Sequence, residues 1–244
     1  MAAVSGEVPI KSFSTIHLYY DDTYQFSCRG NVLGIYETQF NGEERSIVVL
    51  DQTVMHPQGG GQSTDIGTIS SPDGNIKFEV SHVQKPRDTN YIEHIGTFTT
   101  DERLIVGQEV TVEINSGRRC TNARIHSAGH LLDSAFINLG ITNLVPSKGY
   151  HFPDGPYVEY IGDIPAEKRE EVINLLNIES ERLIKESIGV VVSVNERNER
   201  EVNVGGVSCM CGGTHVKNTA EIKGLKVSKI KKSKKNVRVS YTVL

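Results

Sequence analysis

Two short stretches, His126-Ser-Ala-Gly-His130 and Cys211-Gly-Gly-Thr-His215, constrain this chain more than any other feature of its sequence. The first lies in a run, 119–139, whose apolar residues recur at helical spacing. Residues four apart share one face of a helix, so His126 and His130 can direct two imidazoles at one point. In the second stretch, two glycines let the backbone curl until Cys211 and His215 converge. Three imidazoles and one thiolate suit a tetrahedral Zn2+ ion, and we predict one zinc per chain at these four residues.

Each half of this site alone has a simpler explanation, because the histidines could lie on a helix surface and the glycines could form a plain turn. The two halves together favour a metal. The sequence HSAGH lacks the Glu of the HExxH zinc proteases, and the chain has no CxxC pair of the kind found in zinc ribbons. No Ser-His-Asp or Cys-His arrangement is evident, so we predict no protein nucleophile and interpret Cys211 as a ligand. Four protein ligands would fill a tetrahedral coordination shell and leave no position for substrate or water. Three alternatives stay open: one ligand is displaceable, the metal expands its coordination, or the metal only shapes the pocket.

Length and composition describe an ordinary globular protein. The 244 residues suffice for one large or two modest domains, with 23% charged and 37% hydrophobic residues. The four cysteines lack the spacing of a disulfide framework, which favours a reducing compartment. Residues 1–15 contain no apolar core of a signal peptide, and no apolar run approaches ~18 residues. We therefore expect no membrane span and a cytoplasmic location.

The order of local patterns predicts an α+β fold with two domains. Residues 1–115 hold short strand-like segments separated by turns, which favour a small β-barrel-like domain; these segments are 16–20, 31–40, 45–51, 67–71, 76–83 and 108–114. Residues 116–244 combine helices at 119–139 and 164–188 with further strands, which predicts an α/β domain around the metal site. Gly140 is expected to end the first helix.

The motifs HSAGHLL and CGGTHV resemble the editing domain of alanyl-tRNA synthetase and its free-standing relatives, the alanyl-tRNA editing proteins (AlaX type) of medium length. The resemblance implies zinc at His126, His130, Cys211 and His215, and identifies residues 116–244 with the second additional, or editing, domain. It implies a trans-editing hydrolase that deacylates mischarged Ser-tRNA(Ala), with Gly-tRNA(Ala) as the second substrate. The expected partner is the mischarged alanine tRNA, with no obligate protein partner evident.

The loop 50–62 carries three consecutive glycines, a pattern that by itself is typical of a flexible hairpin. Editing proteins carry a similar LD-x-T…P-x-GGGQ loop over the zinc pocket. The resemblance therefore implies that residues of this loop enclose the substrate, namely Thr53, Gly59, Gly60, Gly61 and Gln62. His56, within the same loop, is expected to be solvent-exposed.

The segment 145–160 resembles the opposite wall of the pocket in editing proteins, where Gln or Thr commonly precedes Lys-Gly. This chain has Ser147 before Lys148, a departure that bears on side-chain recognition. The resemblance implies that both residues bind the substrate. His151 is expected to be a packed or surface residue rather than a fifth ligand.

The charge of the chain is uneven, because residues 223–244 carry +8 and the remainder −12, for a net −4. We predict a closing hairpin turned by 231–236, whose lysines bind tRNA phosphates: Lys231, Lys232, Lys234 and Lys235. A solvated hairpin that aids solubility is the alternative.

A second hydrolytic step is physically reasonable, since an alanine pocket discriminates against serine or glycine by only ~10–200-fold. Two other classes of function remain open at this stage. One is a non-catalytic, zinc-stapled tRNA-binding module, and the other is a zinc hydrolase of small molecules that needs no tRNA.

Overall fold

The computed structural model describes residues 13–244; residues 1–12, the larger part of the stretch without a signal-peptide core, lie outside the described range. The fold is mixed α+β, as predicted. The described residues divide into two compact units. The first runs to Gln58 and again from Thr64 to Ser116, and the second combines Gly59–Ser63 with Gly117–Leu244. The end of the Gly-rich loop thus belongs to the second unit.

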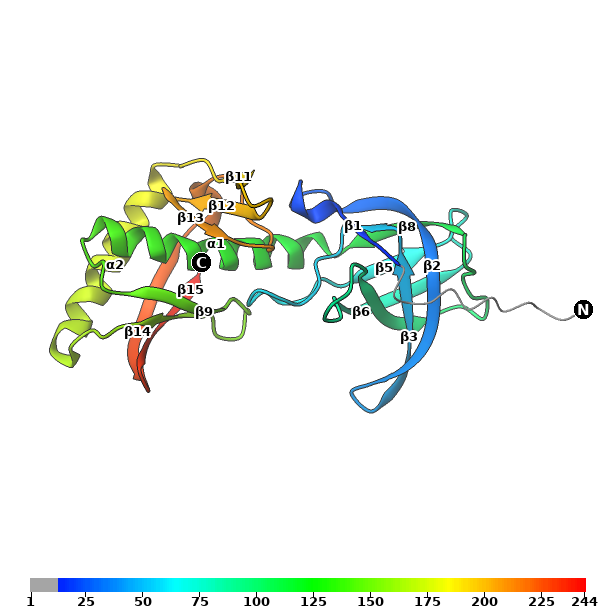
Figure 1. Ribbon diagram of the computed structural model, residues 1–244, viewed down its shortest axis with the longest axis horizontal. Helices are drawn as coiled ribbons and strands as arrows, with labels where there is room; N and C mark the ends of the chain where they lie inside the picture. The colour runs from blue at the N-terminus through cyan, green and yellow to red at the C-terminus, as the bar shows by residue number, and fades with distance from the viewer. Residues whose placement is uncertain (1–12) are drawn as a thin grey trace, which may run out of the picture. The chain divides into compact units, whose positions relative to one another are not determined.

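Six antiparallel strands of the first unit close into a barrel in the order β2-β3-β7-β6-β5-β8 (Figure 1). Their bounds are β2 (Ser27–Phe40), β3 (Glu43–Leu50), β5 (Gly67–Ser70), β6 (Lys77–Gln84), β7 (Glu93–Phe98) and β8 (Glu109–Ile114). Alternate residues along the strands point inward, and Val48, Ile69 and Phe78 are fully buried in the resulting core. Two short strands, β1 (Ile16–His17) and β4 (Gln52–Thr53), pair in parallel.

Local patterns mislead at two places in this unit. The strand predicted over 16–20 ends at His17, because Leu18–Tyr20 form a 3-10 helix. Strand β7 has no counterpart in the prediction, because its run of buried residues includes a histidine that breaks the apolar signal. His94 is fully buried and donates from Nδ1 to the carbonyl oxygen of Val48 at 3.0 Å, which satisfies the ring inside the barrel.

In the second unit, α1 (Ser116–Asn138) lies against a four-stranded sheet in the order β14-β15-β10-β9. The strand bounds are β9 (Val145–Tyr150), β10 (Tyr157–Ile161), β14 (Leu225–Ser233) and β15 (Asn236–Val243). Tyr241 of β15 donates its hydroxyl to the carbonyl oxygen of Ile125 at 2.9 Å, which ties sheet to helix. Gly140 ends α1 as predicted: its φ is +73°, and the next amide, of Ile141, donates to the carbonyl oxygen of Phe136 at 3.0 Å.

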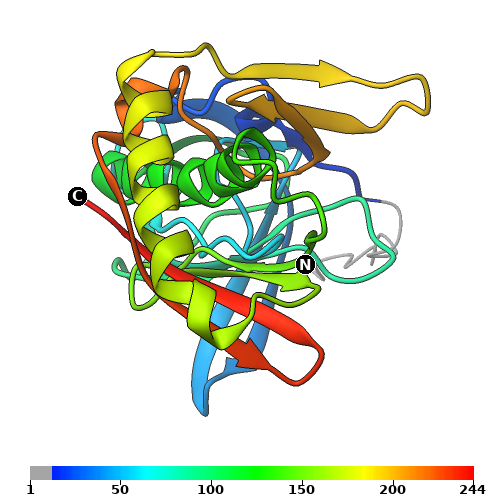
Figure 2. The same ribbon diagram turned by 90° about the vertical axis from the view of Figure 1, so that its left-hand side faces the viewer.

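The second helix, α2 (Arg169–Lys185), follows a 3-10 turn at Ala166–Lys168 and runs alongside β14 (Figure 2). Asn177 bonds both backbone groups of Val227, so that its side chain amide continues the ladder of β14. In the sequence, five apolar residues of the helix predicted over 164–188 form an inward stripe: Val172, Leu175, Leu176, Leu183 and Ile184. The structure buries four of them, Val172, Leu176, Leu183 and Ile184. Leu175, predicted to point inward, is 38% exposed.

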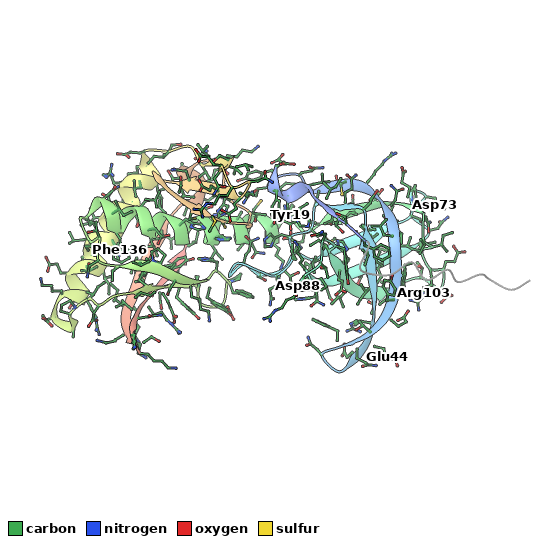
Figure 3. The ribbon with its side chains drawn as sticks, in the orientation of Figure 1. Tyr19, Glu44, Asp73, Asp88, Arg103 and Phe136 are labelled. Atoms are coloured by element: carbon green, nitrogen blue, oxygen red, sulfur yellow. The ribbon has the colours of Figure 1, made fainter. Side chains whose placement is uncertain are left out.

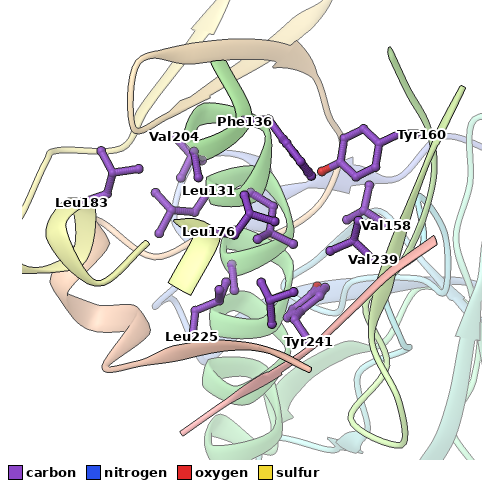
Figure 4. Close-up of a cluster of buried hydrophobic side chains, with 14 of the residues drawn as sticks. Leu131, Phe136, Val158, Tyr160, Leu176, Leu183, Val204, Leu225, Val239 and Tyr241 are labelled. Carbon is purple, nitrogen blue, oxygen red and sulfur yellow. The ribbon is translucent and has the colours of Figure 1, made fainter. Parts of the chain in front are cut away.

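The core of the second unit gathers between α1, α2 and the sheet (Figure 4). Phe136 of α1, also marked in Figure 3, meets Tyr160 of β10 edge to face, with ring centroids 5.0 Å apart. A separate antiparallel sheet joins β11 (Val191–Val194), β12 (Arg200–Val204) and β13 (Val207–Met210). The charged run 196–201, a connection by its sequence, therefore ends inside β12. No helix within residues 13–244 combines the length and the apolar character needed to cross a membrane.

The predicted turn at 231–236 is shorter in the structure. Strand β14 continues through Lys231 and Lys232 to Ser233, and β15 resumes at Asn236, so that Lys234 and Lys235 alone form the turn. All four lysines are exposed. Lys232 pairs with Asp163 at 2.7 Å, which neutralises part of the positive charge of this hairpin.

Candidate metal centre

The two sequence motifs meet in the second unit. One potential ligand atom from each of His126, His130, Cys211 and His215 lies within 4.8 Å of the other three, so these residues could hold a metal ion. The Sγ atom of Cys211 is 3.4 Å from Nε2 of His126 and 3.3 Å from Nε2 of His215. Helix α1 supplies the first two residues at a spacing of four, and the bend after β13 supplies the others.

Gln62 fixes the orientation of His126. Its Oε1 accepts from His126 Nδ1 at 2.8 Å and from the amide of Thr214 at 3.0 Å, while its Nε2 donates to the Thr214 hydroxyl at 2.9 Å. The proton of His126 is thereby placed on Nδ1, which leaves the Nε2 lone pair directed at Cys211. Gln62 is fully buried, so every polar atom of its amide is used inside the second unit.

Ser127, the second residue of HSAGH, lies beside His215 as Gln62 lies beside His126. Its Oγ lies 3.4 Å from His215 Nδ1 and accepts from the amide of Val216 at 3.0 Å. A proton on His215 Nδ1 can point at this oxygen and leave Nε2 for a metal. Two ligand histidines therefore have partners on the nitrogen that faces away from Cys211, the arrangement common around metal-bound imidazoles.

Two glycines allow the rings to approach the backbone. A Cβ atom at Gly213 would overlap the His126 ring, and one at Gly129 would overlap the ring of His151. His151 stacks on His126 with ring centroids 4.4 Å apart. The second glycine of CGGTH is thus needed for close packing as well as for the bend.

Electrostatics favour a thiolate in this cluster. Burial raises the pKa of Cys211, but the adjacent His130 and the amide of Gly213 outweigh it, and the net shift is downward. Burial, with a smaller contribution from His130, lowers the pKa of His151 to about 3, so this ring is neutral. Its Nδ1 lies 2.7 Å from the Tyr241 hydroxyl, which already donates to Ile125 and therefore accepts from His151.

A cavity of about 580 Å³ adjoins the cluster at His130. Residues of α1, β9, β10 and β13 line it, and most of them are apolar, including Phe136, Leu144 and Met210. The polar lining includes Asp133 and Tyr160, whose hydroxyl donates to Asp133 Oδ1 at 2.7 Å. A mostly apolar cavity with a few convergent polar groups is the usual form of a small-ligand site.

The structure brings some of the predicted substrate residues to this cavity and places others elsewhere. Ser147 and Lys148 line it, and the Ser147 hydroxyl donates to the Glu159 carbonyl oxygen at 3.0 Å. Gly59, Gly60, Gly61 and Gln62 lie in the same unit but outside the lining. Gly61 accepts from the amide of His151 at 2.8 Å.

Thr53 belongs to the first unit. It is fully buried, donates to His94 Nε2 at 2.8 Å and accepts from the amide of Met55 at 3.0 Å, so its hydroxyl is occupied inside that unit. The expectation of an exposed His56 is wrong, because this residue is only 3% exposed. His56 donates its amide to Asp65 at 2.7 Å, and Asp65 returns a backbone bond, so the loop folds inward. His151 is packed, as expected.

Sequence reasoning missed three residues around the cluster. Two of them contact Nδ1 of His130: Asp133 Oδ2 lies 3.8 Å from it and Cys209 Sγ 3.2 Å. The third is Ser127, whose Oγ contacts His215. The spacing of Asp133, three residues after His130 on one helix, was a usable signal. Cys209 offered none, because its distance from α1 along the chain hides the contact.

Comparison with family models gives two matches. Residues 9–118 match the model described as tRNA synthetases class II (A), and residues 200–239 match the model of the threonyl and alanyl tRNA synthetase second additional domain. The second match contains the Cys211 half of the cluster.

Curated proteins similar to this chain fall into two groups. The alanine–tRNA ligase of Prochlorococcus marinus (strain AS9601) is 33% identical over 75% of this chain but 22% of its own length, so the chain spans about a quarter of such ligases. The alanyl-tRNA editing protein AlaX-M of Pyrococcus horikoshii is 32% identical over 92% of this chain and 97% of its own length. The AlaX-M protein of Methanosarcina barkeri is 28% identical over 93% of this chain and 98% of its own length.

Proposed function

Because the chain belongs to the family of AlaX-M alanyl-tRNA editing proteins, we propose that it is a trans-editing aminoacyl-tRNA hydrolase that deacylates mischarged Ser-tRNA(Ala). The observation that carries the proposal is the cavity beside His130, since it joins a potential metal cluster to a mostly apolar space of small-ligand size. Gly-tRNA(Ala) is the second substrate of the proposal.

We assign zinc to the cluster because its donor set is three imidazoles and one sulfur, with a lowered pKa at Cys211. His126, His130, Cys211 and His215 would hold the ion. When bound, zinc supplies a Lewis acid that can polarise an ester carbonyl or lower the pKa of a water. Gln62 and Ser127 hold the protons of His126 and His215 on Nδ1, which prepares both Nε2 atoms for this role.

The chain's own contribution to hydrolysis is then positioning. An aminoacyl ester is already activated toward water, so holding it in one geometry removes much of the entropic barrier without a protein nucleophile. The apolar cavity walls can pack against the acyl group and reduce its contact with water. Ser147 donates its proton to Glu159 and accepts a long bond, 3.5 Å, from Asn236, so one lone pair of its oxygen remains for the hydroxyl of a seryl group.

Docking of the tRNA is assigned to the hairpin of β14 and β15. Lys231, Lys234 and Lys235 are exposed near its tip, and a cluster of this kind binds phosphates in a salt-dependent way. The glycines Gly59–Gly61 support the loop that carries Gln62. The hydroxyl of Thr53 already bonds His94 and the amide of Met55, so substrate recognition is assigned to Ser147 rather than to Thr53.

The test is deacylation of Ser-tRNA(Ala) with the enzyme at one hundredth of the substrate concentration. We expect many turnovers per enzyme molecule and little hydrolysis of Ala-tRNA(Ala). A tRNA-binding module would instead protect the ester, and a small-molecule hydrolase would cleave free seryl esters equally well. Either result would contradict the proposal.

A further inference from the structure

The cavity contains one unexplained charge. Among the described residues that line it, Asp133 is the only acidic one, and its side chain is 12% exposed. Most of the remaining lining is apolar. A largely enclosed carboxylate in such surroundings needs partners, and a cationic ligand in the cavity would add one to those that the protein supplies.

One oxygen of Asp133 accepts a short hydrogen bond from the protein, and the other forms only a long ion pair. Oδ1 accepts from the Tyr160 hydroxyl at 2.7 Å. Burial and the nearby Asp133 raise the pKa of Tyr160 well above its usual range, so the phenol keeps its proton and orients the carboxylate. Oδ2 forms a long ion pair with His130 Nδ1 at 3.8 Å, too long for a good hydrogen bond, and has a further lone pair for a donor in the cavity.

Support of His130 is the competing role for Asp133. The Sγ atom of Cys209 is closer to His130 Nδ1, at 3.2 Å, than Asp133 Oδ2 is, at 3.8 Å, so this nitrogen has a second partner. The contact of Asp133 with His130 is therefore long and shared with Cys209, which leaves Asp133 able to bind a ligand in the cavity.

The charges of the cavity are also ordered by depth. Asp133 lies largely enclosed, whereas Lys148, the basic side chain of the lining other than histidine, is exposed. An aminoacyl-tRNA terminus has the matching order, with its ammonium group on the acyl part and its phosphates outside.

Resting on the proposed function, we propose that Asp133 binds the α-ammonium group of the aminoacyl ester and so positions the ester for cleavage. The ammonium nitrogen is two covalent bonds from the carbonyl carbon, and Asp133 follows His130 by one helical turn. Binding the ammonium at Oδ2 therefore brings the carbonyl to the His130 side of the metal cluster. Substrates whose amine is blocked or replaced lose this contact.

The experiment compares two esters of the same size. One is Ser-tRNA(Ala), and the other is the same tRNA after nitrous acid has converted the α-ammonium into a hydroxyl. Single-turnover rates are measured for the natural protein and for Asp133→Asn, whose side-chain oxygen still accepts from Tyr160. Asp154→Asn is the matched control, because Asp154 also accepts from a tyrosine, Tyr150, at 3.0 Å but lies outside the cavity lining.

We expect Asp133→Asn to lower the rate on Ser-tRNA(Ala) by about 10- to 100-fold, the range of a charge-assisted hydrogen bond, and the rate on the deaminated ester less than about twofold. Zinc content should stay unchanged, and Asp154→Asn should behave as the natural protein. Equal losses on both esters, or loss of zinc, would overturn the inference in favour of a structural role.

Failure of the proposed function gives a different result. If the natural protein cleaves neither ester, binding of 3′-(serylamino)-3′-deoxyadenosine and of its deaminated analogue, measured by calorimetry, still decides the role of Asp133. Tighter binding of the amine, lost in Asp133→Asn, supports the anchor without hydrolysis. Equal binding of the two compounds by the natural protein contradicts it.

Discussion

Replacing Gln62 by Leu should weaken both the metal site and the second unit. The change removes three hydrogen bonds and leaves two buried donors without an acceptor, His126 Nδ1–H and the amide of Thr214. An unsatisfied buried donor costs about 1–3 kcal/mol, so we expect the free energy of unfolding of the metal-free protein to fall by about 3 kcal/mol. Loss of a partner to a metal-bound histidine lowers metal affinity by about 10- to 100-fold.

Two measurements check this prediction. Urea unfolding of the metal-free protein gives the change in stability, and competition with a chelator gives the change in zinc affinity. Gln62→Glu should recover most of the affinity, because a carboxylate still accepts from both donors. Gln58→Leu is the control, since Gln58 is exposed and its side chain has no part in the cluster. Zinc affinity in Gln62→Leu within about twofold of the natural protein would refute the reasoning.

Three further predictions concern other parts of the chain. Changing Lys231, Lys234 and Lys235 to Glu should reduce the dependence of log K for tRNA on log[salt] by about two to three units, and an unchanged slope would place the tRNA surface elsewhere. Ser147→Ala should lower the ratio of Ser-tRNA to Gly-tRNA cleavage about tenfold, or about 1.4 kcal/mol; an unaltered ratio would mean that selection is steric. Burial lowers the pKa of His94 from 6.5 to about 4. Between about pH 6.5 and 4 the unfolded chain binds a proton that the folded barrel excludes, so the free energy of unfolding should fall as the pH drops through this range. In urea unfolding, His94→Gln should remove this part of the dependence of stability on pH.

The four residues of the metal cluster can be predicted from local sequence patterns. A spacing of four on a helix and a Gly-Gly bend each bring two ligands together, and the structure places all four within 4.8 Å. The end of α1 at Gly140 is equally local, because a positive φ there is acceptable to glycine.

The cavity and its support depend on contacts that no local pattern reports. Gln62 bonds His126 and Thr214, which are distant from it in the sequence. The glycines before Gln62 favoured a role in enclosing the substrate, so its support of His126 was not predicted. Strand β7 was not predicted, because the buried His94 interrupts its run of apolar residues. His56 was misjudged because its burial depends on Asp65, a partner in the returning arm of the loop.

We propose that the cluster of His126, His130, Cys211 and His215 is the zinc site of a deacylase. The most direct test measures zinc content and Ser-tRNA(Ala) deacylation on the same samples of natural protein and of the double variant Cys211→Ala, His215→Ala. We predict about one zinc per chain with activity in the natural protein, loss of both after chelation, recovery of both with added zinc, and neither in the double variant. Full deacylation by metal-free protein, or full zinc occupancy in the double variant, would contradict the account.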